Sequence, residues 1–165
     1  MRRMVTMVSA AAILTAALAA PAAGVEPARS WDKVIVGNAG NNTLVGTSGA
    51  DKILGKGGND TLQGRKKRDL LQGGTGNDSL QGGGAKDKLY GGPGADRLTG
   101  GPGNDLLHGG PGKDRLVGGQ GNDTLRSNGD KARDNVDCGA GLRDIAYVDA
   151  RDVVTGCETV RVVSQ

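Results

Sequence analysis

Residues 73–126 read GGTGNDSLQ GGGAKDKLY GGPGADRLT GGPGNDLLH GGPGKDRLV GGQGNDTLR, six consecutive copies of one nine-residue unit. Four less regular copies precede them, so ten units fill residues 37–126 without insertion or deletion. The shared pattern is Gly-Gly-x-Gly-x-Asp-x-Leu-x, in which position one is always glycine and position eight is always leucine or isoleucine. Such a fixed period indicates a repeat architecture in which each unit packs against its neighbours.

The first six residues of each unit have the composition of an oxygen-rich loop. Glycine at positions one, two and four allows positive φ angles, so this segment can curl with its carbonyl oxygens turned inward. Position six adds a carboxylate in nine of the ten units. Calcium takes six to eight oxygens at about 2.3 to 2.6 Å, and one loop supplies about half of that number. Two stacked loops together would therefore make a calcium site.

The last three residues of each unit predict a short strand. Thr61-Leu62-Gln63 is typical, with an apolar residue between two polar ones. This period of two points the leucine inward and its neighbours outward. A strand this short is unstable alone, so the units need each other. The pattern favours an all-β coil with two units per turn, loops on opposite edges and leucines meeting in the middle.

The repeats resemble the haemolysin-type calcium-binding (RTX) family, and the resemblance covers 90 of the 165 residues. It implies a right-handed parallel β-roll, a β-solenoid of about five turns for ten units. It also implies that each calcium lies between the loops of units n and n+2, held by loop carbonyls and by aspartates of both loops. Ten units paired in this way give at most about eight ions.

The resemblance assigns ligands residue by residue. The implied metal-binding carboxylates are those of Asp51, Asp60, Asp69, Asp78, Asp87, Asp96, Asp105, Asp114 and Asp123. The implied carbonyl donors include those of Gly74, Gly76, Gly92, Gly94, Gly101, Gly103, Gly110, Gly112, Gly119 and Gly121.

Several units depart from the pattern. Position six is Asn42 in the first unit, and position four is Lys67 in the fourth and Ala85 in the sixth. Because alternate units share an edge, the Lys67 and Ala85 defects lie on the same edge. We expect sites flanking Asp69 to be weak. We expect the opposite edge to bind calcium first and most fully, through Asp78, Asp96 and Asp114.

The fourth unit also carries a basic cluster, residues 64–69 with the sequence GRKKRD. One interpretation is a docking patch for an anionic polymer. The other, which we favour, is a decayed loop whose cationic side chains are solvated.

The amino-terminal segment, residues 1–22, predicts a secretory signal peptide. It has a basic start, an apolar stretch and small residues at Ala20-Pro21-Ala22. The alternative is a membrane anchor, but the apolar stretch is shorter than the roughly 20 residues needed to span a bilayer. We therefore expect a secreted, extracellular protein, with no transmembrane segment after signal cleavage.

Composition argues against nucleic acid as a partner. The formal net charge of +3 falls to about +1 once Arg2 and Arg3 leave with the signal peptide. Trp31, Tyr90 and Tyr147 are the only aromatic residues, too few for a platform on which bases stack.

The segments that flank the repeats have separate expectations. Residues 23–36 form a leader ending in a strand at Val34-Ile35-Val36, and residues 127–165 form a small β cap over the open end of the coil. Cys138 and Cys157 are the only cysteines, and in a secreted chain a disulfide between them is the natural interpretation. Free thiols or a metal-binding pair are the alternatives.

The sequence offers no catalytic constellation. His108 is the only histidine and falls at an outward-facing position, and Ser48 lies in a variable loop position. We therefore expect no enzyme. Two functions remain: a secreted calcium-binding protein that folds on binding calcium, or a calcium-rigidified surface adhesin that holds a cell-envelope polymer or protein.

Overall fold

Residues 31–163 are described in a computed structural model, and they form only β-strands joined by short loops. The expected signal peptide, residues 1–22, and residues 23–30 of the leader lie outside the described residues. Within residues 31–163 there is no helix long and apolar enough to cross a membrane.

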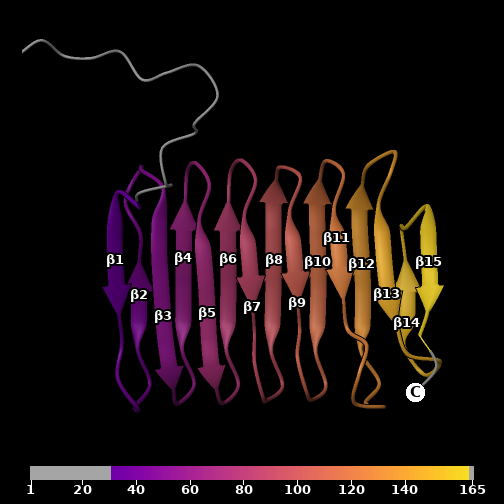
Figure 1. Ribbon diagram of the computed structural model, residues 1–165, viewed down its shortest axis with the longest axis horizontal. Coiled ribbons are helices and arrows are strands. Elements are labelled where there is room, and N and C mark those ends of the chain that lie inside the picture. Colours follow the sequence, from indigo (N-terminus) through magenta and orange to yellow (C-terminus); the bar gives the residue numbers. More distant parts are fainter. Residues whose placement is uncertain (1–30, 164–165) are drawn as a thin grey trace, which may run out of the picture. The chain divides into compact units, whose positions relative to one another are not determined.

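In residues 31–163, fifteen strands alternate between two parallel sheets, which lie one in front of the other in the view of Figure 1. The eight-stranded sheet contains, in spatial order, β1 (Lys33–Val36), β3 (Asp51–Gly57), β5 (Leu70–Thr75), β7 (Lys88–Tyr90), β9 (Leu106–His108), β11 (Thr124–Arg126), β13 (Ile145–Val148) and β15 (Thr159–Val162). The seven-stranded sheet contains β2 (Thr43–Val45), β4 (Thr61–Arg65), β6 (Ser79–Gly83), β8 (Arg97–Pro102), β10 (Arg115–Gln120), β12 (Asn135–Ala140) and β14 (Val153–Thr155).

The strand register confirms a coil with two nine-residue units per turn. Leu62 of β4 pairs with Leu80 of β6, eighteen residues further along the chain. The predicted all-β parallel solenoid is thus confirmed, but it makes about seven turns instead of the expected five. The additional turns come from residues after Arg126, which add β12 to β15 to the same two sheets.

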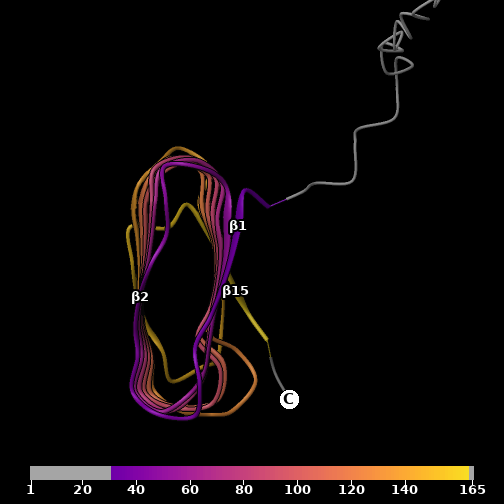
Figure 2. The same cartoon turned by 90° about the vertical axis from the view of Figure 1, so that its left-hand side faces the viewer.

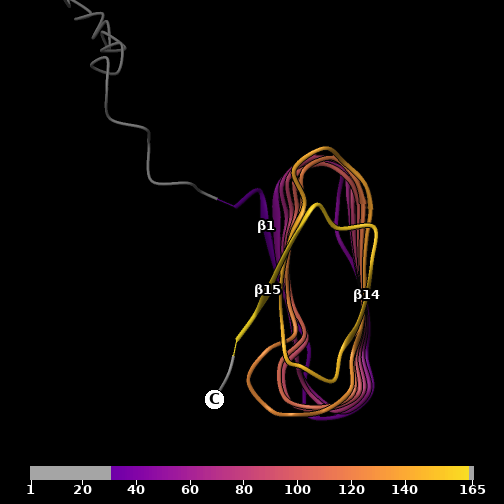
Figure 3. The same cartoon turned by 90° about the vertical axis from the view of Figure 1, so that its right-hand side faces the viewer.

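The core is a double ladder of position-eight side chains. End-on views show the two sheets facing each other across a narrow interior (Figures 2 and 3). From Ile53 to Leu125, every position-eight side chain is at most 1% exposed. Burial falls toward both ends, where Ile35 and Leu44 are only partly buried and Val160 is 47% exposed.

The loops lie along two edges of the coil. The first edge, at the bottom of Figure 1, carries the loops that precede even-numbered strands, with position-six residues Asn42, Asp60, Asp78, Asp96 and Asp114. The second edge, at the top, carries the loops that precede odd-numbered strands, with Asp51, Asp69, Asp87, Asp105 and Asp123.

The tail continues the coil with a disturbed period. Arg115 pairs with Asn135 at an offset of 20 residues and Thr124 pairs with Ile145 at an offset of 21. The predicted disulfide between Cys138 and Cys157 is present. The last strand, β15, is exposed along its whole length and carries Val162, which is 61% exposed.

Candidate metal centre

A continuous column of carboxylates runs along each edge of the coil. On the first edge, the backbone N–H of Asp60 donates to Oδ1 of Asp78 over 2.7 Å, and that of Asp78 donates to Oδ1 of Asp96 over 2.8 Å. On the second edge, Asp69 donates in the same way to Asp87 over 2.7 Å. The position-six aspartate therefore ties its own loop to the preceding turn.

In ten column carboxylates the second oxygen, Oδ2, is buried and has no hydrogen-bond partner among residues 31–163. This holds for Asp60, Asp69, Asp78, Asp87, Asp96, Asp105, Asp114, Asp123, Asp134 and Asp144. An unpaired buried carboxylate oxygen is strongly unfavourable because it has lost its water, so native proteins compensate such a group with a donor or a cation. The column thus has the chemistry of a cation site.

Backbone carbonyls supply a second set of oxygens beside the column. The N–H groups of Gly74 and Gly76 donate to the carbonyls of Gly91 and Pro93 in the next turn, each over 2.9 Å. Carbonyls of positions one and three are used in this way. Within residues 31–163, the position-four carbonyls accept no hydrogen bond. The carbonyl oxygen of Gly76 instead lies so close to Gly94 that a Cβ atom there would overlap it.

Left-handed backbone conformations put these carbonyls in place. From the third unit onward, position two has a positive φ, even where it carries a side chain as in Lys56 (86°) and Arg65 (90°). At position four, Gly76 has φ of 120° and Gly94 of 151°. Lys67 has φ of only 60°, since a side chain holds the residue near the left-handed minimum. Its loop therefore departs from the glycine geometry.

Ala85 in the sixth unit shows the same departure, with φ of 77°. Both residues lie on the second edge, as the sequence predicts. The carbonyl oxygen of Ala85 nevertheless lies against Gly103 as that of Gly76 lies against Gly94, so this contact is kept in the Ala85 loop.

The first two loops are closed by their own side chains. No residue between Gly37 and Gly55 has a positive φ. Asn38 N–H donates to Oδ1 of Asn42 over 2.8 Å, and Thr47 N–H donates to Oδ2 of Asp51 over 2.6 Å. Among the predicted ligands, Asp51 is thus the one whose Oδ2 is already engaged by its own loop.

Two features of the site are not predicted by the sequence pattern. A Cβ atom at Gly73 would overlap Oδ2 of Asp78, which explains why position one is always glycine. The columns also continue beyond the repeats, since Asp114 N–H donates to Asp134 over 2.7 Å and Asp123 N–H donates to Asp144 over 2.6 Å. The only signal was an Asp followed two residues later by an apolar residue, as in Asp134-Asn135-Val136.

Burial raises the pKa of eight column carboxylates, those of Asp69, Asp78, Asp87, Asp96, Asp105, Asp114, Asp123 and Asp134. The pKa of Asp87 rises to about 8, chiefly through desolvation, with a smaller contribution from the neighbouring carboxylates of Asp105 and Asp69. Desolvation likewise raises the pKa of Asp114 to about 7. The backbone hydrogen bond that each carboxylate accepts opposes the rise. A positive charge beside the column would lower these pKa values.

The donor set fits a hard cation. Within residues 31–163, no three or more His, Cys, Asp or Glu side chains gather in an arrangement able to hold a metal by themselves. A metal would therefore be held by backbone carbonyls together with carboxylates of adjacent turns. An all-oxygen set of this kind suits calcium.

The chain matches the family model described as RTX calcium-binding nonapeptide repeat (4 copies) over residues 34–62, 64–98 and 90–125, which together span more than half of the chain. No curated protein shows significant similarity to it.

Proposed function

Since the chain belongs to the RTX calcium-binding nonapeptide repeat family, we propose that it is a secreted β-roll that folds when calcium binds between its stacked loops. The supporting observation is the buried, unpartnered Oδ2 oxygen repeated in ten carboxylates. Without a cation, like charges one strand spacing apart repel each other inside the coil. One inward leucine per nine residues provides little apolar burial to offset this repulsion and the loss of chain entropy.

Units five and seven illustrate the donors of one site. The carbonyls of Gly74 and Gly76 come from the loop of unit five. The carboxylate of Asp78 comes from the same loop, and that of Asp96 comes from the loop of unit seven. When bound there, calcium would neutralise the column and tie two turns together. If free calcium is tenfold above the dissociation constant, each site adds about 1.4 kcal/mol to the stability of the fold. Several such sites together equal the net stability of a small domain.

Circular dichroism tests this proposal. The chain from residue 23 onward is measured at pH 8 in chelator, in millimolar calcium and in the same concentration of magnesium. We expect a disordered spectrum in chelator, β structure in calcium and no effect of magnesium, which prefers octahedral shells and retains its waters. A β spectrum in chelator equal to that in calcium would refute calcium-dependent folding.

Secretion is supported by the predicted signal peptide and by the Cys138–Cys157 disulfide, which is typical of oxidising compartments. The expected mature chain begins shortly after Ala22 and is recovered from the culture medium. Mass spectrometry of medium and membrane fractions distinguishes this from an anchor. Full-length chain in the membrane fraction would contradict secretion.

No catalytic role is proposed for His108. Its ring packs edge-on against Tyr90, with centroids 6.1 Å apart. Its pKa is lowered, first by burial and then by the positive charge of Arg126. Both features suit a packed surface side chain of the roll.

An adhesin is the second candidate, and one surface feature favours it. The outer face of the eight-stranded sheet carries a column of planar side chains, Tyr90, His108, Arg126, Tyr147 and Arg161. The Arg126 guanidinium lies 4.8 Å from the centroid of the Tyr147 ring, and that of Arg161 lies 5.7 Å from it. Such a column offers flat faces and positive charge to a cell-envelope polymer.

Co-sedimentation with insoluble cell-wall polysaccharide tests the adhesin. Binding that requires calcium and is lost in Tyr147→Ser, but kept in Thr99→Ala on the other sheet, would support it. Equal sedimentation of both variants with the wild type, or none by any, would contradict it.

A further inference from the structure

The second edge continues beyond the repeats in a loop made of residues 138–144, here called the tail loop. It lies one turn after the loop of the tenth unit, with Gly139 paired to Gly119. The match to the repeat family ends at residue 125, so the tail loop lies outside it.

The tail loop contacts the tenth unit as one repeat loop contacts another. Gly121 N–H donates to the carbonyl of Ala140 over 2.9 Å, the same bond that joins Gly76 to Pro93. Asp123 N–H donates to Oδ1 of Asp144 over 2.6 Å, as in the regular columns. The φ of Gly139 is 90°, in the left-handed region used by position two.

The loop of the tenth unit has the geometry of the all-glycine loops. Gly119 and Gly121 have φ of 121° and 124°, close to those of Gly74 and Gly76. The carbonyl oxygen of Gly121 lies so close to Gly141 that a Cβ atom there would overlap it. The carbonyl donors are thus oriented as in the regular loops.

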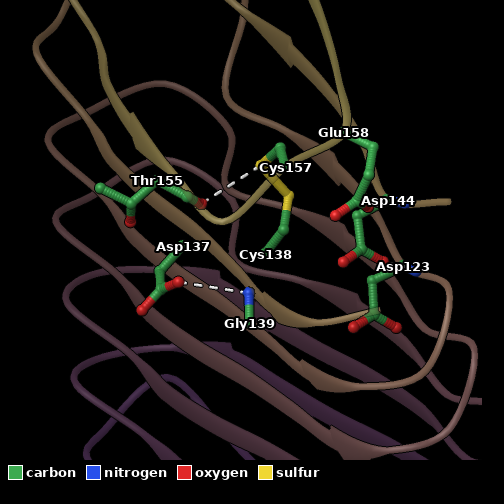
Figure 4. The surroundings of a disulfide bond; sticks show 8 residues. All are labelled: Asp123, Asp137, Cys138, Gly139, Asp144, Thr155, Cys157 and Glu158. Carbon is green, nitrogen blue, oxygen red and sulfur yellow. Dashed lines mark hydrogen bonds between the residues drawn. A yellow bond between two sulfur atoms is a disulfide. The ribbon is translucent and has the colours of Figure 1, made fainter. Parts of the chain in front are cut away.

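The tail loop contributes a buried carboxylate with one free oxygen. Asp144 is 0% exposed, and its Oδ2 accepts no hydrogen bond from residues 31–163. Figure 4 shows the carboxylates of Asp123, Asp144 and Glu158 in a column beside the disulfide. Oε2 of Glu158 accepts the Asp144 N–H over 2.7 Å, so the column extends one step further.

The tail loop differs in sequence from a repeat loop at two positions, which compensate each other, and Gly141 at position four lacks the positive φ of the repeats. Cys138 takes position one, where a side chain in a regular unit would overlap the carboxylate. Arg143 is an additional residue, and the Asp144 carboxylate lies instead against Gly141, with both oxygens 2.5 Å from where a Cβ atom would be. Cys138 thereby has room to form its disulfide with Cys157.

We propose that calcium also binds between the loop of the tenth unit and the tail loop, a site that rests on the proposed function of the repeats. The carbonyls of Gly119 and Gly121 and the carboxylates of Asp123 and Asp144 hold the ion. The disulfide at Cys138 fixes the tail loop, so the ion and the disulfide together close the carboxyl-terminal end of the second edge.

Native mass spectrometry at fixed free calcium tests the tail site with two matched variants. Asp144→Asn keeps the Oδ1 acceptor for Asp123 N–H but removes the charge. Asp32→Asn removes a carboxylate at the opposite end of the coil. We expect the wild type and Asp32→Asn to bind equal numbers of ions and Asp144→Asn to bind one fewer. Hydrogen exchange in wild-type calcium titrations should show residues 139–144 becoming protected together with residues 119–123.

Three outcomes decide between the proposals. If the wild type binds calcium and Asp144→Asn binds the same number of ions, the tail site is wrong and the proposed function still stands. Exchange in residues 139–144 that does not respond to calcium, while residues 73–114 become protected, would do the same without a variant. A wild type that binds no calcium would overturn both proposals.

Discussion

The backbone N–H of Asp78 donates to Oδ1 of Asp96, one turn further along the first edge, over 2.8 Å. Oδ2 of Asp96 meanwhile stays buried without a partner. One side chain thus holds the preceding turn with one oxygen and offers the other to a cation. An Asn substitution separates these roles, because Asn keeps the acceptor and loses the charge.

The two edges should respond differently to this substitution. Asp96 lies between all-glycine loops, whereas Asp69 lies between the closed loop of Thr47 and the Ala85 loop. In saturating calcium, Asp96→Asn should lower the free energy of unfolding by about 1 to 3 kcal/mol, the contribution of one or two sites. Asp69→Asn should lower it by less than about 1 kcal/mol. Urea unfolding measures both, and equal losses would show that the edges are equivalent.

Lys67→Gly should improve calcium binding. Glycine can reach the φ of 120° found at Gly76, which Lys67 at 60° does not adopt, and the substitution also removes a positive charge beside Asp69. Calorimetric titration should show one more ion bound or several-fold tighter binding. Lys66→Gly removes a neighbouring exposed charge without changing a left-handed residue and serves as control. A gain as large in the control would mean that charge alone is responsible.

Acid should partly replace calcium. Desolvation raises the pKa of Asp105 and Asp114 to about 7 and of Asp87 to about 8, above the value of about 3.9 in an unfolded chain. Protonation therefore favours the folded coil: this stabilisation is complete below about pH 4 and is lost as pH rises through 6 to 8. In chelator, circular dichroism should show more β structure at pH 5 than at pH 8. More structure at pH 8 would reverse the sign of this linkage.

Removing the disulfide should loosen the tail while leaving the repeats able to bind. Replacing Cys138 and Cys157 by Ser should destabilise the turns after Arg126 by about 3 kcal/mol. Hydrogen exchange in calcium should accelerate in residues 135–163 and stay unchanged in residues 73–114. The ion count should fall by at most one. Loss of all calcium binding would show that the tail is required for the repeats to fold.

The fold of residues 37–126 could be predicted because a fixed period determines the register. Because Leu62 and Leu80 hold the same position in units that lie one turn apart, they must pair with each other. The two turns in the tail could not be predicted, because offsets of 20 and 21 residues break that period. Recognising Asp144 as a column member required knowing that Arg143 is an insertion.

At the site, the type of ligand could be predicted from the sequence, but the exceptional behaviour of Asp51 could not. Asp51 has the same place in the pattern as Asp78, yet Thr47 binds its carboxylate through both N–H and Oγ1. Only the structure distinguishes a side chain that closes its own loop from one that faces the next.

A crystal structure grown in millimolar calcium tests the central claim most directly, at the site between the loops of residues 73–78 and 91–96. We predict a calcium ion there, about 2.3 to 2.6 Å from carbonyl oxygens of Gly74 and Gly76 and from carboxylate oxygens of Asp78 and Asp96. Water or a protein cation against those oxygens, with no calcium between the loops, would contradict the account.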